Sequence, residues 1–308
     1  MVTVSDTIEI QPSALAKRLL HRANPDGGWG YSIDGPSFAE PTALSCLALA
    51  VQGIEHEAHG RGLHWLTDGQ GPDGRIPVMA DDDSPAWPTG LALLAWASAD
   101  VDEVSVFQPH IDRAVHWLLT TSGQSLPLNR DIFGHDTTLQ GWSWVVDTHS
   151  WVEPTAYAIM ALKSQGYADH PRVREGVRLL LDRAIAGGGW NYGNTRVLAN
   201  TLRPFPATTG IVLSALAGED ADPRIEASIA YLADELQEVR SPLSLGWGLI
   251  GLTVWRTRPA KADHWLNECT AQTGKQPTGH PTNTIEEAVV LLAARGDDFL
   301  LHLLERRN

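Results

Sequence analysis

Residues 25–51 of this 308-residue chain, PDGGWGYSIDGPSFAEPTALSCLALAV, contain a unit whose parts recur along the sequence. The opening Pro25-Asp26-Gly27 returns as Pro72-Asp73-Gly74, and Pro41-Thr42 returns as Pro88-Thr89. In both cases the second copy follows the first by 47 residues. Motifs that recur at a common offset indicate an internal repeat.

Two longer matches extend the repeat over the first two thirds of the chain. Glu40-Pro41-Thr42-Ala43 returns as Glu153-Pro154-Thr155-Ala156, and Gly27-Gly28-Trp29 returns as Gly188-Gly189-Trp190. These offsets differ from the first one. The chain is therefore built from copies of one unit that are joined by loops of unequal length.

Each unit is predicted to contain two helices separated by a loop rich in glycine and proline. The first helix of each pair carries charge on one face and Leu, Ile or Trp at helical spacing on the other, which indicates an amphipathic helix. The second helix of each pair has small and apolar residues on nearly every side, which indicates a helix that is buried all round. The first helices are expected at 11–23, 56–69, 108–121, 170–185, 223–238 and 260–272, and the second helices are expected to begin near 41, 88, 154, 208, 243 and 283.

Six amphipathic helices alternating with six buried ones predict an (α/α)6 barrel with an inner and an outer ring, formed by residues 1–308 as one domain. Proline is tolerated in the first helical turn, where its missing N–H would have no helical partner. Gly53, Gly166 and Gly218 follow three of the second helices and are expected to be left-handed C-caps. An open solenoid is the alternative, but it requires near-equal repeats and polar caps. The unequal loops favour the closed ring.

The composition excludes several classes of function. The hydrophobic content is 43% and the formal net charge is -14, which argues against nucleic acid or an anionic membrane surface as the main partner. The apolar runs are too short to span a bilayer, and Met1 to Ile10 has no signal-peptide pattern, so a cytoplasmic location is expected. Two cysteines make no disulfide framework. The chain has 12 Trp against 5 Tyr and 5 Phe, and this excess is a first functional indication.

One stretch resembles a known repeat. Arg61-Gly62-x2-Trp65-Leu66-x3-Gln70-x3-Gly74-x-Ile76 is similar to the tryptophan-glutamine repeat of squalene-hopene and oxidosqualene cyclases, with Ile76 in place of the final Trp. The same spacing fits residues 176–190, which have the closing Trp190 but lack the Gln, and Trp117-Leu118 and Trp265-Leu266 resemble further copies. As a pattern the resemblance covers nearly the whole chain.

The resemblance implies the prenyltransferase and squalene-cyclase repeat superfamily, whose members are α/α barrels with an apolar central cavity for polyprenyl chains. In that group the repeat is a structural brace, so Trp65, Gln70 and Gly74 are interpreted as scaffold. The chain has the size of one such barrel, whereas the triterpene cyclases carry two. A partner subunit is possible, as in the protein prenyltransferases.

The resemblance also points to candidate acids. In the related cyclases the proton donor is an Asp in Asp-Asp-Thr-Ala or Asp-Cys-Thr-Ala at the start of an inner helix. Glu153-Pro-Thr-Ala places a glutamate at that position, so Glu153 is a candidate catalytic acid, and Glu40 is a weaker one. The full Asp-x-Asp-Asp motif is absent, and a carboxylate at a helix N-terminus can equally be a cap.

Two further acidic segments lie in loops ahead of inner helices. Asp82 and Asp83, in the run 81–83, are candidate catalytic residues that could bind Mg²⁺ or raise the pKa of one another. The alternative interpretation of this acidic run is a solvated loop tip. Asp136, in His135-Asp136-Thr137-Thr138, is the other candidate because it superficially echoes the Asp-Thr-Thr ending of some bacterial cyclase motifs.

The long segment from Gln124 to Glu153 is the most informative loop, because long loops in compact domains are usually functional or disordered. Aromatic faces stabilise cations, so tryptophans at the mouth of an apolar cavity suit a carbocation or an isoprenoid tail. The alternative is that these side chains only pack over one end of the barrel. The candidate substrate-binding residues here and in the neighbouring loops are Trp87, Trp142, Trp144, Asp147, His149, Trp151, Trp190 and Tyr192.

A zinc site is not expected. Protein prenyltransferase β subunits hold zinc through an Asp-x-Cys pair and a distant His, but Cys46, Cys269 and His280 lack those partners. The default for each cysteine is a buried neutral thiol. No cofactor is expected, except Mg²⁺ if the substrate is a diphosphate.

These observations predict an acid-initiated, class II type cyclisation or isomerisation of a polyprenyl substrate in a Trp-lined cavity. One alternative is a non-catalytic isoprenoid-binding or protein-interaction barrel, which the missing Asp-x-Asp-Asp motif supports. Another is a sugar-active α/α barrel, which would use paired carboxylates and Trp platforms. The tryptophan-glutamine repeat argues against the sugar-active barrel.

Overall fold

The fold is taken from a computed structural model of the chain. It describes residues 12–54, 57–79, 82, 85–99, 101–128, 133–197, 200–273, 283–297 and 299–305. Across these residues helices dominate, and the single small sheet is an antiparallel hairpin of β1 (Arg196–Val197) and β2 (Asn200–Thr201) on a loop.

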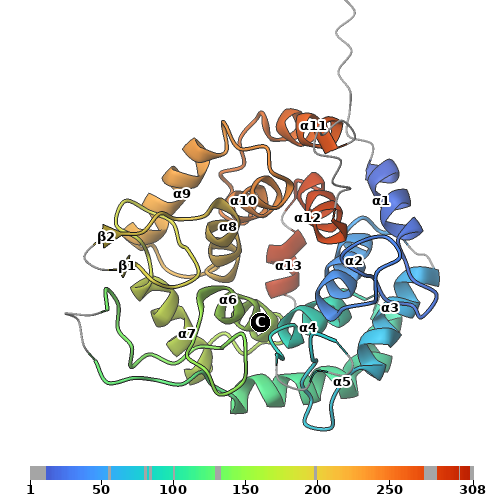
Figure 1. The fold of residues 1–308 in the computed structure, drawn as a ribbon, viewed down its shortest axis with the longest axis horizontal. Coiled ribbons are helices and arrows are strands. Elements are labelled where there is room, and N and C mark those ends of the chain that lie inside the picture. The colour runs from blue at the N-terminus through green and yellow to red at the C-terminus, as the bar shows by residue number, and fades with distance from the viewer. Residues whose placement is uncertain are drawn as a thin grey trace, which may run out of the picture.

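Two concentric sets of helices make up the ring (Figure 1). The outer set is α1 (Pro12–His21), α3 (Glu57–Asp68), α5 (Val101–Thr120), α7 (Pro171–Asp182), α9 (Pro223–Glu235) and α11 (Ala262–Thr273). The inner set is α2 (Ala39–Val51), α4 (Thr89–Ala97), α6 (Val152–Lys163), α8 (Pro206–Ala215), α10 (Pro242–Val254) and α12 (Thr284–Ala294). The inner helices are buried along most of their length, as their apolar sequences predict.

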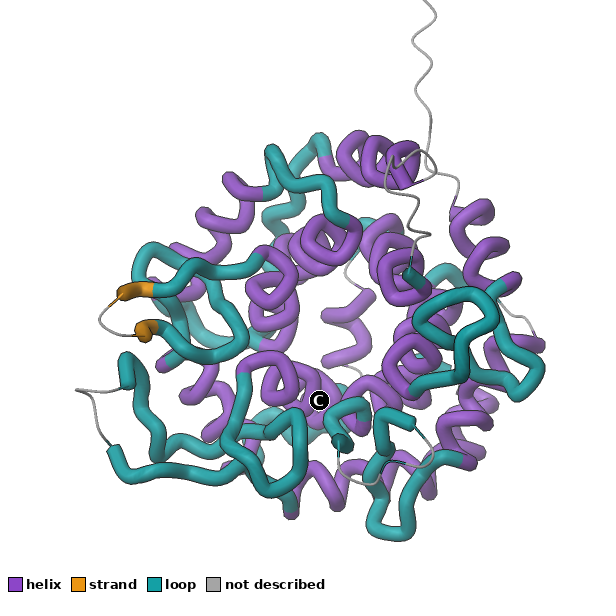
Figure 2. The backbone as a smooth tube through the Cα atoms, in the orientation of Figure 1, coloured by secondary structure: helices purple, strands orange, loops and turns teal. Residues whose placement is uncertain are grey.

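Each inner helix packs between its two inner neighbours, and α12 returns to pack against α2, so the ring closes. The (α/α)6 barrel predicted from the repeats is confirmed. The left-handed conformation expected at Gly53, Gly166 and Gly218 is also confirmed, with φ of 64°, 82° and 78°. Figure 2 shows that the longest loops gather at one end of the ring.

The first and last units are joined by polar contacts that the repeat pattern does not show. Arg22, after α1, is ion-paired with the buried Glu287 of α12 at 2.7 Å. The backbone N–H of Thr284, at the start of α12, donates to the carbonyl of Tyr31 at 3.0 Å. Because both pairs connect residues from opposite ends of the chain, they hold the ring shut.

Within the repeats, the residue that closes each Gly-x-Trp loop is fixed to the inner helix that follows. Its backbone N–H donates to the hydroxyl of a buried threonine in the first turn of that helix. The four pairs are Trp29 with Thr42, Ile76 with Thr89 and Trp142 with Thr155, each at 2.9 Å, and Trp190 with Thr209 at 3.0 Å. The indole N–H groups of the three tryptophans donate to carbonyls of the preceding outer helices, at Leu19, Leu118 and Leu180.

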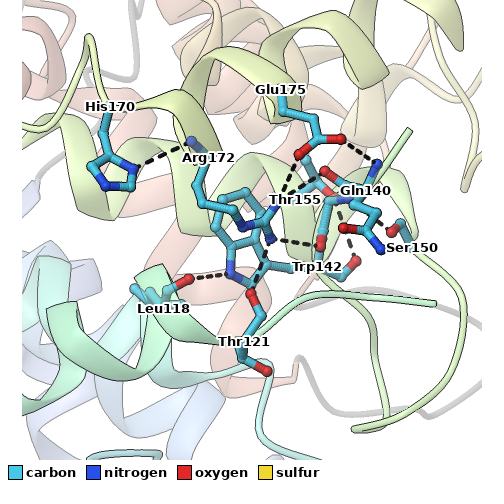
Figure 3. A network of polar contacts seen from close by, with 10 residues as sticks. Leu118, Thr121, Gln140, Trp142, Ser150, Thr155, His170, Arg172 and Glu175 are labelled. Atoms are coloured by element: carbon cyan, nitrogen blue, oxygen red, sulfur yellow. Dashed lines mark hydrogen bonds and ion pairs between the residues drawn. The ribbon is translucent and has the colours of Figure 1, made fainter. Parts of the chain in front are cut away.

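Figure 3 shows this brace around Trp142. The guanidinium of Arg172 lies over the indole of Trp142 at 4.4 Å from the ring centroid. It also donates to the carbonyls of Thr121, Gln140 and Gly141. One arginine of α7 therefore holds the start and the middle of the long loop against the outer ring.

The tryptophan-glutamine motif has the bracing role that its resemblance implies. The side-chain amide of Gln70 donates to the carbonyls of Gly74 and His110, both at 3.0 Å, and so links the loop after α3 to α5. Gly74 has φ +98°, and a Cβ there would collide with the backbone oxygen of Arg113. Only glycine fits this position without strain.

Two features differ from the sequence prediction. Helix α5 begins at Val101, seven residues earlier than expected, and Pro109 lies inside it. A thirteenth helix, α13 (Phe299–Glu305), follows the ring and was not predicted. In the view down the shortest axis α13 lies inside the circle of inner helices (Figure 1). None of the helices in the described ranges is long and apolar enough to cross a membrane.

The threonine brace generates a prediction about stability. Thr155→Val keeps the side-chain shape but leaves the buried N–H of Trp142 without its acceptor, so the free energy of unfolding should fall by about 1–3 kcal/mol. Urea unfolding of both proteins measures the difference. Thr148→Val is the matched control on the same loop, where the hydroxyl bonds near the surface, and it should change stability by less than about 0.5 kcal/mol. Equal effects of the two substitutions would contradict the bracing role.

Candidate functional site

The N-terminal ends of α2, α6, α8, α10 and α12 surround a cavity of about 430 Å³. Its walls combine aliphatic and aromatic side chains with the carboxyl groups of three glutamates and the hydroxyl groups of serine, threonine and tyrosine. The lining residues are Glu40, Leu44, Glu153, Tyr157, Tyr192, Phe205, Pro206, Ala207, Thr208, Ile211, Ser241, Leu243, Ser244, Trp247, Ile285 and Glu286. A cavity with apolar walls and convergent polar groups is the usual form of a small-molecule site.

Glu40 reaches this cavity from the first turn of α2. One of its carboxyl oxygens, Oε2, accepts a hydrogen bond from the hydroxyl of Tyr31 at 2.6 Å. Burial raises the pKa of Glu40 to about 7, against the opposing effect of the Tyr31 hydrogen bond, and the charge of Glu153 raises it further. Glu40 is therefore protonated in a substantial fraction of molecules at neutral pH.

Glu153 occupies the equivalent position on α6. Its Oε1 accepts a hydrogen bond from the hydroxyl of Thr208, on α8, at 2.6 Å. Burial raises the pKa of Glu153, and the hydrogen bond from Thr208 opposes that rise. Among the described residues, the second oxygen of each of these two carboxyl groups makes no hydrogen bond. Each group therefore has one anchored oxygen and one that is available to a ligand.

Two opposing effects act on this pair. The N-termini of the inner helices carry partial positive charge, which favours ionised carboxylates near them. Removal from water disfavours the charged form, and for both groups burial is the largest influence on the pKa. Because Glu153 adds its negative charge to the surroundings of Glu40, a proton on Glu40 is favoured further.

Aromatic rings stand beside the carboxyl groups. Tyr157 and Trp247, on α6 and α10, are both in the cavity wall with ring centroids 6.1 Å apart. Behind Tyr157, Trp87 stacks at 6.0 Å, and Trp144 meets Trp87 edge-on at 4.9 Å. At the rim, Tyr192 and Phe205 have centroids 5.1 Å apart.

The structure places the predicted site residues in three different environments. Glu153 and Tyr192 line the cavity, and Trp87 and Trp144 form the aromatic layer behind it. Trp142 and Trp190 lie outside the lining, 3% and 0% exposed. Their indoles point between the two rings of helices and donate to outer-helix carbonyls, as Figure 3 shows for Trp142.

The remaining residues of the long loop are not brought to the cavity. Asp136 forms a local turn, in which its carboxylate accepts from the backbone and hydroxyl of Thr138, and its N–H donates to Asp182. Asp147 is exposed in a turn with φ 61°. His149 is exposed and packs on the half-buried Trp151 at 4.7 Å between ring centroids.

Asp82 is half-buried, and its backbone N–H donates to Met79, but it does not line the cavity. Asp83, like its neighbour Asp81, lies outside the described residues. In the described part of the chain, no group of three or more His, Cys, Asp or Glu side chains could hold a metal ion. Cys46 and Cys269 are both buried thiols.

Several cavity residues were missed or undervalued from sequence. Glu40 has the same four-residue motif as Glu153, and this exact repetition was the available signal for a pair of acids. Tyr157 and Trp247 are large aromatic residues within inner helices made mainly of small and aliphatic residues, which was a second signal. Nothing in the sequence pairs Tyr31 with Glu40 or Thr208 with Glu153, because both pairs connect separate helices or loops.

No family model and no curated protein matches the chain. Several solved structures match the chain. An alpha-amylase from Clostridium perfringens is 11% identical, with 92% of this chain and 96% of that chain covered and a TM-score of 0.62. The type II terpene cyclase MstE from Scytonema is 16% identical, with 94% and 97% covered and a TM-score of 0.58. A variant of that cyclase in complex with its product, merosterolic acid A, is 17% identical, with 94% and 96% covered and a TM-score of 0.60.

These similarities establish the class of fold. The chain has an α/α-barrel fold similar to that of the terpene cyclase. It also matches the endo-beta-1,4-glucanase CMCax from Acetobacter xylinum at 14% identity, with 94% of this chain and 99% of that chain covered and a TM-score of 0.55. At such identities the comparison defines the fold, and the function has to be argued from the cavity.

The raised pKa of Glu40 predicts how stability depends on pH. Below about 4.5 the carboxyl is protonated in both the folded and the unfolded chain, and it imposes no penalty. Between 4.5 and about 7 the unfolded chain releases this proton while the folded chain keeps it, so this group lowers stability as pH rises. The full shift corresponds to about 3 kcal/mol, and solvent screening of this partly exposed carboxyl reduces the effect to about 1–3 kcal/mol.

Glu40→Gln removes this titration and keeps an acceptor for Tyr31. Relative to the wild type, the variant should gain about 1–3 kcal/mol of unfolding free energy between pH 4.5 and pH 7.5. Urea unfolding at a series of pH values measures this difference. Glu153→Gln should show the same sign. Wild-type and Glu40→Gln stability curves that run parallel over this range would show that Glu40 titrates normally.

Proposed function

We propose that this barrel catalyses the acid-initiated cyclisation or isomerisation of a polyprenyl compound, with Glu40 and Glu153 as the proton-transfer pair. The supporting observation is the pair itself: two half-buried carboxyl groups with raised pKa values in one cavity whose walls also present aliphatic and aromatic side chains. Perturbed carboxyl groups in a cleft are typical of acid–base sites.

The proposed reaction begins with a proton on the free oxygen of Glu40. Transfer of this proton to a double bond or an epoxide oxygen leaves a carboxylate on Glu40 and a carbocation on the substrate. A second double bond of the same molecule then supplies the electron pair that closes a ring. Loss of a proton from a neighbouring carbon to Glu153 restores a neutral product, so the reaction needs no other reactant.

The cavity wall suits such a cation. Ring faces carry negative electrostatic potential and stabilise a nearby positive charge, more strongly where water is excluded. Tyr157 and Trp247 lie in the wall, and Trp87 stacks behind Tyr157. The carboxylate that forms on Glu40 adds further stabilisation of positive charge, as does the carboxylate of Glu153 before it accepts the proton.

The pKa of Glu40 also bears on the substrate. A carboxyl group with a pKa of about 7 is a weaker acid than an ordinary glutamic acid. An epoxide oxygen is more basic than an isolated double bond. We therefore expect an epoxide or an activated double bond to react faster than an unactivated polyene.

Glycoside hydrolysis is the second candidate. It uses two carboxyl groups, one of them protonated at neutral pH through burial, and Glu40 and Glu153 meet this requirement. The similar folds of an alpha-amylase and an endoglucanase add support. The aliphatic residues in the wall, Leu44, Ile211, Leu243 and Ile285, favour the isoprenoid instead, because a sugar needs many polar partners.

The test is an incubation of the purified protein with farnesyl diphosphate, geranylgeranyl diphosphate, squalene and oxidosqualene. Each is run with and without Mg²⁺, since a diphosphate carries this ion, and organic extracts are read by mass spectrometry. We expect a cyclic or isomerised product whose rate falls at least about a hundredfold in Glu40→Gln and in Glu153→Gln. Glu226→Gln, the same change on the exposed face of α9, should leave the rate within about twofold.

Each other outcome assigns a different function. Product that survives in both glutamine variants would move the acid to another residue, such as Glu286, the third carboxyl group in the cavity wall. Tight binding of a polyprenyl compound without turnover would support the non-catalytic binding barrel. Release of reducing sugar from starch or soluble cellulose, lost in the same two variants, would establish the glycosidase in place of the cyclase.

A further inference from the structure

A second, smaller cavity lies on the other side of the barrel lumen. Its volume is about 40 Å³, and most of its walls come from the C-terminal halves of the inner helices. Apolar side chains dominate, with Thr253, Arg295 and Asp297 as the polar members; the apolar residues include Leu47, Val51, Leu94, Met160, Val254 and Leu292. We call this space the lower cavity and the one with Glu40 and Glu153 the upper cavity.

Trp247 belongs to the walls of both cavities. It lies near the middle of α10, and only 5% of its surface is exposed. Glycines lie on both sides of it in the sequence, at Gly246 and Gly248, where an added Cβ would come within 2.7 Å of Val289 and 2.9 Å of Leu236. Because neighbouring helices occupy that space, α10 is packed tightly around the point where it presents this indole.

The indole of Trp247 differs from the bracing indoles. Those of Trp29, Trp142 and Trp190 donate their N–H groups to outer-helix carbonyls. That of Trp247 makes no hydrogen bond with any residue that the structure describes. Its ring instead lies between the two cavities, with Tyr157 at 6.1 Å between centroids on the upper side.

Helix α13 limits the lower cavity. Phe299 and Leu300, in its first turn, are part of the lining, and Leu303 and Leu304 are buried. The segment that leads to α13 is attached to the end of α2, where the guanidinium of Arg295 donates to the carbonyl of Val51. The lumen thus has three levels along its axis: the upper cavity, Trp247, and the small lower cavity above α13.

We propose that Trp247 determines the maximum length of the apolar chain that the upper cavity accepts. A chain whose polar or reactive end lies at Glu40 and Glu153 extends along the lumen until it meets the indole of Trp247. Removal of the indole joins the two cavities and lets a longer chain reach the lower one. This inference takes its ligand class from the proposed function, but it concerns binding alone, so it is tested without turnover.

The experiment measures the dissociation constants of geraniol, farnesol and geranylgeraniol by calorimetry, for the wild type and Trp247→Ala. In the wild type, affinity should rise with chain length up to a limit and then stop rising. In Trp247→Ala the length limit should move to a longer alcohol. The ratio of the affinity for that alcohol to the affinity for the next shorter one should be at least about tenfold greater than in the wild type. Each additional buried methylene raises the affinity about fourfold, and imperfect filling of the joined cavities reduces the gain in affinity from one isoprene unit.

Two further variants serve as controls. Trp255→Ala removes a tryptophan that follows the same helix, bonds to the carbonyl of Leu213 and lines neither cavity, so the length limit should stay that of the wild type. Trp247→Leu keeps an apolar side chain and covers the case in which the alanine variant does not fold, as judged by circular dichroism. It should shift the limit in the same direction.

An unchanged length limit in folded Trp247→Ala or Trp247→Leu would overturn the inference. So would a folded wild type that binds none of the three alcohols. A failure of the proposed function would look different. The protein would bind these alcohols with a length limit set by Trp247 but form no product from any substrate. That result would support the inference about Trp247 and contradict the proposed cyclase activity.

Discussion

The hydrogen bond from a loop-closing N–H to a threonine hydroxyl sets the register of the inner helices, and the cavity depends on it. The threonines are Thr42, Thr89, Thr155 and Thr209. The residue two positions before each threonine lies at the cavity or next to its wall, and these residues are Glu40, Trp87, Glu153 and Ala207. One bracing device, repeated in four units of the ring, thus places a side chain from each of these units at or beside the same space.

The repeat also explains how a stable scaffold holds two unfavourably placed acids. Large tryptophans, an arginine that stacks on one of them, and the Arg22–Glu287 pair fix the outer ring and close it. Burial of Glu40 and Glu153 raises their pKa values and lowers stability at neutral pH, but the hydrogen bonds from Tyr31 and Thr208 hold each carboxyl in place. Local violations of this kind are expected at functional sites.

The sequence predicted the architecture well because the repeat carries it. Alternation of amphipathic and all-apolar helices, proline in first turns and glycine C-caps are local signals, and the structure confirms them. The site was harder to predict, because an excess of tryptophan has two explanations. Trp142 and Trp190 serve as braces, whereas Trp247 lines the lumen, and only the spatial position of each indole separates these roles. Helix α13 carries no repeat motif, and so the pattern gave no reason to expect it.

Direct titration of the two carboxyl groups tests the central claim, that burial in the barrel raises the pKa of two carboxyl groups in one cavity. Carbon-13 NMR of protein labelled at the glutamate side-chain carboxyl group reports each group, with resonances assigned through Glu40→Gln and Glu153→Gln. The account predicts that Glu40 titrates near pH 7 and that Glu153 titrates above the ordinary glutamate range. Tyr31→Phe, which removes the hydrogen bond to the carboxylate, should raise the pKa of Glu40 further. Titration of both carboxyl groups in the ordinary range for glutamate would contradict the account.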